Sequence, residues 1–243
     1  MLFDSHCHLD SQSPPFPKGM IMVTAGYSVG SSKKNLEIAR SNQGVYCCVG
    51  IAPQEAQKFA TEAELEAAIG KIEGIIEIKD PKIVAIGEIG LDFHWAKDEL
   101  QKEMQRKCFG AMLAIANERN LPVVVHCREA MSETLRMLEI SGVRFMMHCF
   151  SGSEEEAKRA LDMGGMISIP PLRSKGRKKV IKLVALERLV AETDSPAIGK
   201  TPGAVRESVA MIAEHRGITP DLAENAVYYN ACRFFGIGGG NHA

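Results

Sequence analysis

Lys82-Ile-Val-Ala-Ile-Gly-Glu88 is a short apolar run that predicts a strand, and a long helical pattern follows it over residues 98–120. The next apolar run, Leu121-Pro-Val-Val-Val-His126, predicts a second strand. Pro122 stands at the start of that run, where a missing backbone donor is tolerated. The order strand, helix, strand is typical of a parallel β-α unit, so this stretch predicts an α/β fold.

The same alternation extends from this unit to both ends of the chain. We predict eight strands, over residues 1–7, 20–26, 44–50, 82–88, 121–126, 143–148, 165–169 and 188–193. Helical patterns are found at residues 32–42, 61–79, 98–120, 131–140, 153–162, 175–186, 204–215 and 219–235. Two of these helices open with a capping-box pattern, Thr61 with Glu64 and Ser153 with Glu156.

The number of predicted strands indicates the architecture. Eight β-α units close a (β/α)8 TIM barrel, and an open doubly wound sheet is the competing arrangement. The length of 243 residues suits one such domain. No linker, repeat or low-complexity tract divides the sequence, so we expect a single domain over residues 1–243, with a frayed glycine-rich tail at 236–243.

Charge and composition restrict the class of protein. The 29 Lys and Arg residues nearly balance the 30 Asp and Glu residues, so any contact with nucleic acid must be local. The seven cysteines are odd in number and lack disulfide-scaffold spacing, which indicates reduced thiols. The sequence shows neither a secretory leader pattern nor an apolar run near the ~20 residues of a membrane span. We therefore expect a soluble cytoplasmic protein with no membrane contact and no obligatory protein partner.

Metal-ligand residue types gather at the predicted ends of the strands. In Phe3-Asp4-Ser5-His6-Cys7-His8-Leu9-Asp10 the two histidines share a strand face, because side chains alternate with a period of two. Catalytic groups of a barrel lie at the carboxyl ends of its strands. Six side chains of metal-ligand type stand at the predicted strand ends, and we find no other such group there. They are His6, His8, Glu88, His126, His148 and Asp194.

These six residues predict a metal site, although each has a simpler interpretation by itself. His126 and His148 are compatible with hydrogen-bonded core histidines, Glu88 with an ordinary ion pair and Asp194 with a helix cap. Four imidazoles and two carboxylates at one mouth suit Zn²⁺, Mn²⁺ or Co²⁺ better than Ca²⁺ or a lone Mg²⁺. Because six protein ligands are too many for one catalytic ion, we predict two divalent cations about 3.5–4 Å apart with a carboxylate between them.

Five motifs together resemble the TatD family of metal-dependent deoxyribonucleases. They are Asp4-Ser5-His6-Cys7-His8-Leu9, Gly87-Glu88-Ile89-Gly90-Leu91-Asp92, Val125-His126-Cys127-Arg128-Glu129, His148-Cys149-Phe150-Ser151-Gly152 and Glu192-Thr193-Asp194-Ser195-Pro196. The resemblance extends to Asn230-Ala231-Cys232-Arg233-Phe234-Phe235, so it covers nearly the whole chain. It implies an amidohydrolase-like barrel with a di-metal site that hydrolyses phosphodiester bonds.

The resemblance also assigns roles to the candidate ligands. One cation is implied to lie between three side chains: His6, His8 and Asp194. The other is implied to lie between His126 and His148, with Glu88 bridging the two ions. Asp194 is the implied proton acceptor for the nucleophilic water, so Asp194 and Glu88 are the candidate catalytic residues. Mg²⁺, Mn²⁺ and Zn²⁺ are the candidate cations.

Substrate contacts are implied by the same resemblance at Arg128, just beyond a ligand, and at Ser151 and Gly152. Relatives usually carry a histidine on each side of the proline in Gly50-Ile51-Ala52-Pro53-Gln54, where this chain has Ala52 and Gln54. Neither position is among the candidate metal ligands. We expect both to lie where substrate is held.

A basic segment after the seventh predicted strand offers an electrostatic contact with DNA. In Leu172-Arg173-Ser174-Lys175-Gly176-Arg177-Lys178-Lys179, Arg173 and Lys175 are the candidate phosphate contacts. A solvated helix start explains such a run equally well. Phe93 and Trp95, in the loop after Glu88, are candidates for stacking on single-stranded bases, although packing within a lid is the commoner role of such residues.

The sequence leaves three functions open. The first is hydrolysis of single-stranded DNA by a metal-activated water. The second is hydrolysis of an amide, a lactone or an aminoacyl ester at the same di-metal site, because a fold does not fix a substrate. The third is metal binding without turnover, which the complete ligand set with Asp194 disfavours.

Two further expectations concern the neighbours of the ligands. Asp4, two residues before His6 on the same strand face, is expected to accept a hydrogen bond from the histidine pair. Cys7, Cys127 and Cys149 each stand next to a ligand, so we expect their side chains to point outward and to pack between sheet and helices rather than bind metal.

Overall fold

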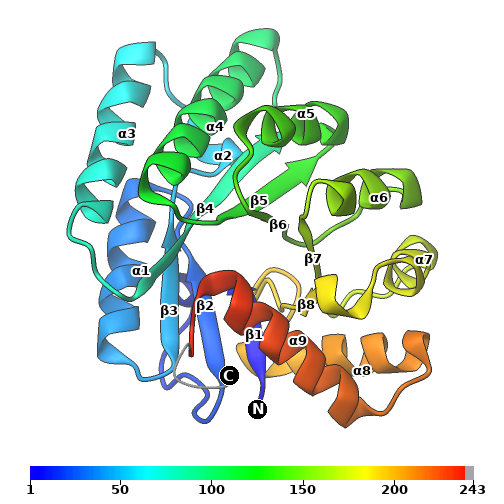
Figure 1. Cartoon of the computed structure of the whole chain (residues 1–243). Helices are drawn as coiled ribbons and strands as arrows, with labels where there is room; N and C mark the ends of the chain where they lie inside the picture. Colours follow the sequence, from blue (N-terminus) through cyan, green and yellow to red (C-terminus); the bar gives the residue numbers. More distant parts are fainter. Residues whose placement is uncertain (239–243) are drawn as a thin grey trace.

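Eight parallel strands in a nearly closed barrel form the centre of the computed structural model, which describes residues 1–238 (Figure 1). Each strand pairs with the next in chain order, from β1 to β8. The strands are β1 Phe3–Cys7, β2 Ile21–Ala25, β3 Val45–Val49, β4 Ile83–Asp92, β5 Val123–Arg128, β6 Phe145–Met147, β7 Met166–Ile169 and β8 Leu189–Ala191. The predicted (β/α)8 barrel is confirmed.

Helices surround the strands and connect them (Figure 1). They are α1 Val29–Ser41, α2 Pro53–Ala56, α3 Glu62–Ile76, α4 Glu99–Arg119, α5 Met131–Ser141, α6 Glu154–Asp162, α7 Lys175–Leu183, α8 Val205–Arg216 and α9 Pro220–Phe235. The capping box of Ser153 and Glu156 is present, and the Thr61 side chain caps α3. The short helix α2 is an addition to the predicted elements. None of the helices in residues 1–238 is long and apolar enough to cross a membrane.

Strand β4 is longer than predicted, and this changes the position of Glu88. The ladder with β5 continues past Glu88 and pairs Asp92 with Arg128. The two strands approach closely at Gly90, where an added Cβ would lie 2.0 Å from the His126 carbonyl oxygen. Glu88 therefore lies within a strand and inside the barrel, not at a strand end, and the loop with Trp95 begins only after Asp92.

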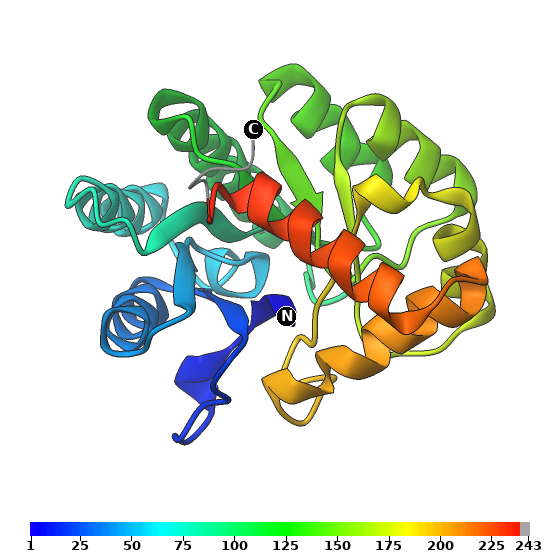
Figure 2. The same ribbon diagram turned by 60° about the horizontal axis from the view of Figure 1, so that its bottom comes forward.

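Two apolar cores stabilise the fold. The larger one lies between the strands and the surrounding helices, and the smaller one fills the barrel interior and continues into α9. Figure 2 shows α9 crossing one end of the barrel. There the rings of Phe3 and Phe235 stack with centroids 5.9 Å apart. Ile237 is also buried, and its backbone N–H donates to the Cys232 carbonyl oxygen at 2.9 Å, so the predicted frayed tail does not include Ile237. The remainder of that tail, 239–243, lies outside the described residues.

Asp4 joins the first strand to the segment after the last one. Its Oδ1 accepts a hydrogen bond from the Thr193 backbone N–H at 2.9 Å, and its Oδ2 accepts one from the Thr193 hydroxyl at 2.6 Å. The backbone N–H of Asp194 donates to the His6 carbonyl oxygen at 2.9 Å in the same seam. The expectation that Asp4 accepts from the histidine pair is wrong, because the carboxylate contacts the backbone N–H of His6 and not an imidazole.

The seven cysteines are free thiols. As expected, Cys7 belongs to the core between strands and helices, and the Cys127 thiol donates to the Thr134 hydroxyl of α5 at 3.3 Å. Cys149 follows β6 instead of lying on it, and it is half-buried. Burial raises the pKa of the Cys127 thiol to about 11 and that of Cys149 to about 12. Both thiols are therefore protonated at neutral pH in the metal-free protein.

The seam interaction leads to a stability prediction. Replacing Asp4 by Ala leaves the buried Thr193 N–H and hydroxyl without their acceptor, so we expect the free energy of unfolding to fall by about 2–4 kcal/mol. Urea denaturation of the metal-free protein measures the change. Glu214→Ala, which removes a surface partner of Arg173, is the control and should change the stability by less than ~1 kcal/mol. Equal effects of the two substitutions would contradict the role of Asp4.

Candidate metal centre

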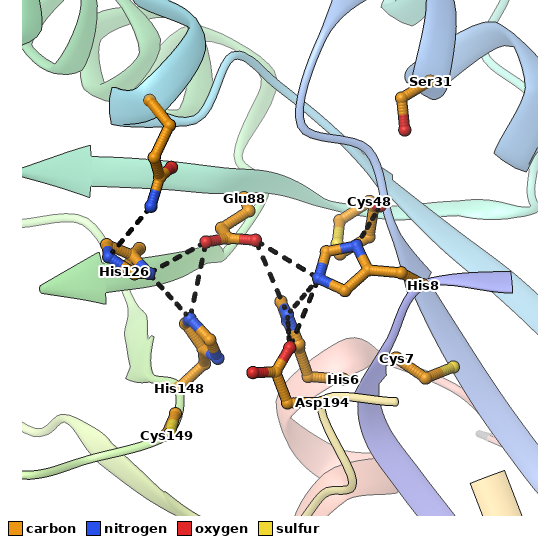
Figure 3. A network of polar contacts seen from close by, with 12 residues as sticks. His6, Cys7, His8, Ser31, Cys48, Glu88, His126, His148, Cys149 and Asp194 are labelled. Carbon is orange, nitrogen blue, oxygen red and sulfur yellow. Dashed lines mark hydrogen bonds and ion pairs between the residues drawn. The ribbon is translucent and has the colours of Figure 1, made fainter. Parts of the chain in front are cut away.

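The six predicted metal-ligand residues come together toward the carboxyl-terminal side of the barrel, although they are distributed along most of the chain. Figure 3 shows their side chains converging from β1, β4, β5 and the segments that follow β1, β6 and β8. Parallel strands bring their carboxyl ends to one face of a barrel, which explains the convergence. The residues are His6, His8, Glu88, His126, His148 and Asp194.

Four ligand atoms form a first group. Nε2 of His6 and Nε2 of His8 lie 3.2 Å apart. Oδ1 of Asp194 lies 3.6 Å from the His6 nitrogen and 3.3 Å from the His8 nitrogen. Oε2 of Glu88 lies 3.7 and 3.5 Å from the same two nitrogens. Ligands that each stand ~2.1 Å from a tetrahedral cation are about 3.4 Å from one another, so the distances from the His6 and His8 nitrogens to either carboxylate match those of metal ligands.

Three ligand atoms form a second group beside the first. Nδ1 of His126 and Nε2 of His148 lie 3.2 Å apart. Oε1 of Glu88 lies 3.0 Å from the His126 nitrogen and 3.5 Å from the His148 nitrogen. The spacing again matches that of ligands around one cation, and three protein ligands leave a position open for water or substrate.

Glu88 belongs to both groups. One of its oxygens faces His126 and His148 and the other faces His6 and His8, as Figure 3 shows. Burial alone would raise the pKa of this carboxyl, but the neighbouring His148 and His126 hold it well below the ordinary value. The side chain is therefore an anion at neutral pH, with an oxygen available to each group.

Hydrogen bonds behind the imidazoles determine which nitrogen faces the centre. Nδ1 of His8 lies 3.1 Å from the Ala25 carbonyl oxygen, and Nε2 of His126 lies 2.9 Å from Oδ2 of Asp92. A proton on each of these nitrogens leaves a lone pair on His8 Nε2 and on His126 Nδ1. These lone pairs point at other nitrogens and at carboxylate oxygens. Lone pairs that face one another in this way repel unless a cation lies between them. The chemistry of these nitrogen and oxygen atoms therefore fits a divalent metal ion.

Two buried carboxylates at the strand ends were not among the predicted groups. Asp92, which is 1% exposed, ends β4 beside His126, and Glu192, which is fully buried, follows β8 with Oε1 3.7 Å from Nδ1 of His148. The prediction that six groups are the only ones at the strand ends is therefore wrong. Their spacing was a usable signal, because Asp92 lies an even number of residues after Glu88 and Glu192 lies two before Asp194.

A pocket of about 440 Å³ opens over the two groups. Ala52 and Gln54 line it, and the expectation that substrate is held at both positions stays a prediction. Nε2 of Gln54 is 3.0 Å from Oδ2 of Asp92, so Gln54 also contacts the carboxylate behind His126. The remaining wall, apart from the ligands, consists of Ser11, Tyr27, Glu55, Pro196 and Ala197.

The five predicted substrate contacts lie outside this pocket lining: Arg128, Ser151, Gly152, Arg173 and Lys175. Arg128 is exposed at the end of β5, and its guanidinium carbon lies 5.7 Å from the centre of the Trp95 ring. Ser151 is exposed, whereas an added Cβ at Gly152 would lie 2.6 Å from the Phe150 ring, which indicates a packing role for the glycine. The structure thus brings the metal-ligand residues together but not these five.

The basic segment after β7 is held by the protein itself. The Arg173 guanidinium lies 2.8 Å from Oε2 of Glu214, and Lys175 is exposed at the start of α7. Arg177 is buried and donates to the carbonyl oxygens of Leu172 and Phe150. These contacts agree with the interpretation of the segment as a solvated helix start. They agree with it at least as well as with a phosphate-binding role.

The carboxylates around the histidines affect their protonation. Burial alone would lower the pKa of His8, His126 and His148, but neighbouring carboxylates raise all three above the ordinary value of 6.5. Asp194 acts on His8 in this way, Asp92 on His126 and Glu88 on His148. The pKa of His6 instead falls well below 6.5, because of burial and the nearby His148. In the metal-free protein, three of the four imidazoles therefore bind a proton more tightly than an ordinary histidine does.

Comparisons with known proteins agree with this geometry. A family model described as TatD related DNase matches residues 3–236. The chain is 31% identical to the uncharacterized metal-dependent hydrolase YabD of Bacillus subtilis, over 98% of this chain and 100% of YabD. It is 29% identical to the 3′-5′ ssDNA/RNA exonuclease TatD of Pantoea ananatis, over 89% of this chain and 88% of that protein. The crystal structure of YJJV, a TatD homolog of Escherichia coli, matches with a TM-score of 0.85 and 25% identity, covering 97% and 98% of the two chains.

The histidine protonation leads to a prediction about metal uptake. Because a bound cation displaces protons from His8, His126 and His148, uptake should release protons, and the affinity should fall as the pH drops through the raised pKa values, above 6.5. Isothermal titration calorimetry with Mn²⁺ or Zn²⁺, in buffers of different ionisation enthalpy, counts the protons released. Heats that do not depend on the buffer, together with an affinity that is constant between about pH 6 and pH 8, would contradict this assignment.

Proposed function

This chain belongs to the family of TatD-related DNases and is a metal-dependent hydrolase. From that premise we propose that it hydrolyses phosphodiester bonds of single-stranded DNA with two divalent cations held at the barrel mouth. One observation carries the proposal: the two oxygens of Glu88 face two separate histidine pairs, each with the spacing of metal ligands. One cation would lie among His6, His8, Asp194 and Glu88, and the other among His126, His148 and Glu88.

The formal charges support two cations rather than one. Four buried or half-buried carboxylates surround the four imidazoles: Glu88, Asp92, Glu192 and Asp194. If the imidazoles are neutral, as metal ligands must be, the carboxylates carry four negative charges in a low-dielectric environment. Two divalent cations neutralise this charge completely, whereas one leaves half of it uncompensated. Mg²⁺, Mn²⁺ and Zn²⁺ are all compatible with this set of oxygen and nitrogen ligands.

Two cations in this arrangement would lower the pKa of an attacking water, polarise a phosphoryl oxygen and stabilise the charge on the leaving oxygen. The chain's own part in this chemistry is to hold the ligands in place. Glu88 fixes the separation of the two groups because its carboxylate spans both. His126, His148 and Glu88 would supply three protein ligands to one cation, which leaves a coordination position for water or substrate. All three residues line the pocket, so this position would be open toward it.

Asp194 is positioned to accept a proton from the attacking water. Its Oδ1 faces His6 and His8, and Figure 3 shows its other oxygen directed away from these rings. The side chain lines the pocket over the ligands, where the scissile phosphate would lie. A carboxylate beside the water can act as the general base without any change in the barrel.

Single-stranded DNA is the substrate class that the surroundings favour. The Pantoea ananatis relative is named an exonuclease for single-stranded DNA and RNA. At the rim, on the loop after β4, Trp95 is 55% exposed with the Arg128 guanidinium over its ring. An exposed aromatic ring paired with a cation is the combination that stacks on an unpaired base and contacts the adjoining phosphate.

Asp194→Asn and metal removal test the catalytic assignment. Asparagine cannot accept the proton, so we expect the rate of cleavage of a labelled single-stranded oligonucleotide to fall at least ~100-fold. A chelator should abolish cleavage, and added Mg²⁺ or Mn²⁺ should restore it. Glu214→Gln, a surface substitution, is the matched control and should retain the wild-type rate.

The same assay distinguishes the nuclease from the other functions. An oligonucleotide that stays intact with Mg²⁺, Mn²⁺ and Zn²⁺, while an ester, lactone or amide is hydrolysed, would refute the nuclease and support a hydrolase of a non-nucleic substrate. Full nuclease activity in the Asp194→Asn variant would refute the assigned role of Asp194.

Trp95→Ala tests the substrate class. Loss of one stacked base contact costs about 1–3 kcal/mol, so kcat/KM on a single-stranded oligonucleotide should fall about 5- to 150-fold. Hydrolysis of bis(p-nitrophenyl) phosphate, which has no base to stack on Trp95, should not change. Tyr229→Ala removes an equally exposed aromatic ring from α9, at the other end of the barrel, and should affect neither substrate. Equal losses on both substrates would contradict a stacking role for Trp95.

A further inference from the structure

The two carboxylates missed by the sequence lie directly behind one of the two ligand groups. Asp92 is paired with His126, and Glu192 lies next to His148. We propose that Asp92 and Glu192 are positioning residues for the cation held by His126 and His148, and that removing either one empties this position while the other cation remains bound. This inference rests on the proposed two-cation site.

Asp92 is held rigidly by four hydrogen-bond donors. Its Oδ2 lies 2.9 Å from Nε2 of His126 and 3.0 Å from Nε2 of Gln54. Its Oδ1 accepts from the backbone N–H groups of His94 at 3.1 Å and Trp95 at 3.3 Å. Because the aspartate cannot rotate without breaking these contacts, it fixes the plane of the His126 ring. It also keeps the proton on Nε2, so Nδ1 presents its lone pair to the centre.

Glu192 occupies the corresponding place behind His148. It is fully buried, and its Oε1 accepts from the Cys149 backbone N–H at 2.6 Å. Nδ1 of His148 and Oε2 of Glu192 are both buried without a hydrogen-bond partner in residues 1–238. Nδ1 of His148 lies 3.7 Å from Oε1 of Glu192, beyond hydrogen-bond distance, so the carboxylate acts on this imidazole through its negative charge, which favours a proton on Nδ1. That arrangement leaves Nε2 of His148 as the ligand atom.

Within residues 1–238, the other ligand group has no carboxylate behind its histidines. Nδ1 of His8 faces the neutral carbonyl oxygen of Ala25, and Nδ1 of His6 is buried without a partner in the described part of the chain. A carboxylate behind an imidazole makes the imidazole a stronger ligand. The group with only three protein ligands therefore has this support, whereas the group with four, including Asp194, does not need it. We expect the two cations to depend on different residues.

Asp92→Asn and Glu192→Gln test the inference, because both keep the size of the side chain and remove its charge. Each protein is dialysed against Mn²⁺ at a fixed free concentration, and bound metal is measured by elemental analysis. We expect two ions per wild-type chain and one per variant chain, with the affinity of the lost ion about 10- to 100-fold weaker. Glu129→Gln is the matched control, because its carboxylate pairs at 2.7 Å with His94, which is not a ligand; it should keep two ions.

Thermal unfolding of the metal-free proteins verifies that the variants fold. A variant that folds like the wild type and still binds two ions with unchanged affinity would overturn the inference, as would a variant that loses both ions together. A wild-type chain that binds only one ion would overturn it as well. A wild-type chain that binds two ions but does not cleave DNA would refute the proposed nuclease, while loss of one ion in the variants would still support the inference.

Discussion

The burial of Glu88 inside the barrel is the constraint on which the rest of the site depends. A carboxylate in the interior is stable only when cations or donors surround it. Here its two oxygens are directed at two pairs of imidazoles, and these imidazoles are themselves directed at one another. The arrangement joins groups from five regions of the chain into one unit. When its imidazoles are neutral, their converging lone pairs and the carboxylate oxygens form a set of ligands that suits divalent cations.

Closure of the barrel and assembly of the metal centre occur at the same place. Asp4 binds Thr193, and the Asp194 backbone N–H donates to the carbonyl oxygen of His6. These contacts hold Asp194 with a positive φ of 48°, a left-handed conformation that is uncommon for residues other than glycine. The seam therefore directs the Asp194 side chain toward His6 and His8. Stability of the barrel and geometry of the site are linked through these few residues.

The strand-helix alternation was sufficient to predict the barrel, and the residue types at the strand ends were sufficient to predict the converging ligands. The prediction failed where the local pattern does not show where a strand ends. Strand β4 continues to Asp92, because its second half pairs with β5 and because Gly90 permits the close approach. Glu192 was missed because it falls inside the predicted eighth strand, residues 188–193, whereas the strand of the structure ends at Ala191. Arg173 was proposed as a phosphate contact, yet its partner Glu214 is distant in sequence.

The sequence by itself determined the eight-unit architecture, the six candidate ligands and the resemblance to the TatD family, because periodicity and residue type are local properties. Only the tertiary structure decided what stands behind each ligand. A hydrogen bond between Asp92 and His126, or between Asp4 and Thr193, joins residues whose separation in the chain carries no recognisable spacing. Which ring nitrogen of a histidine faces a carboxylate depends on the register between neighbouring strands. That register is set by the packing of the whole barrel and not by any one segment.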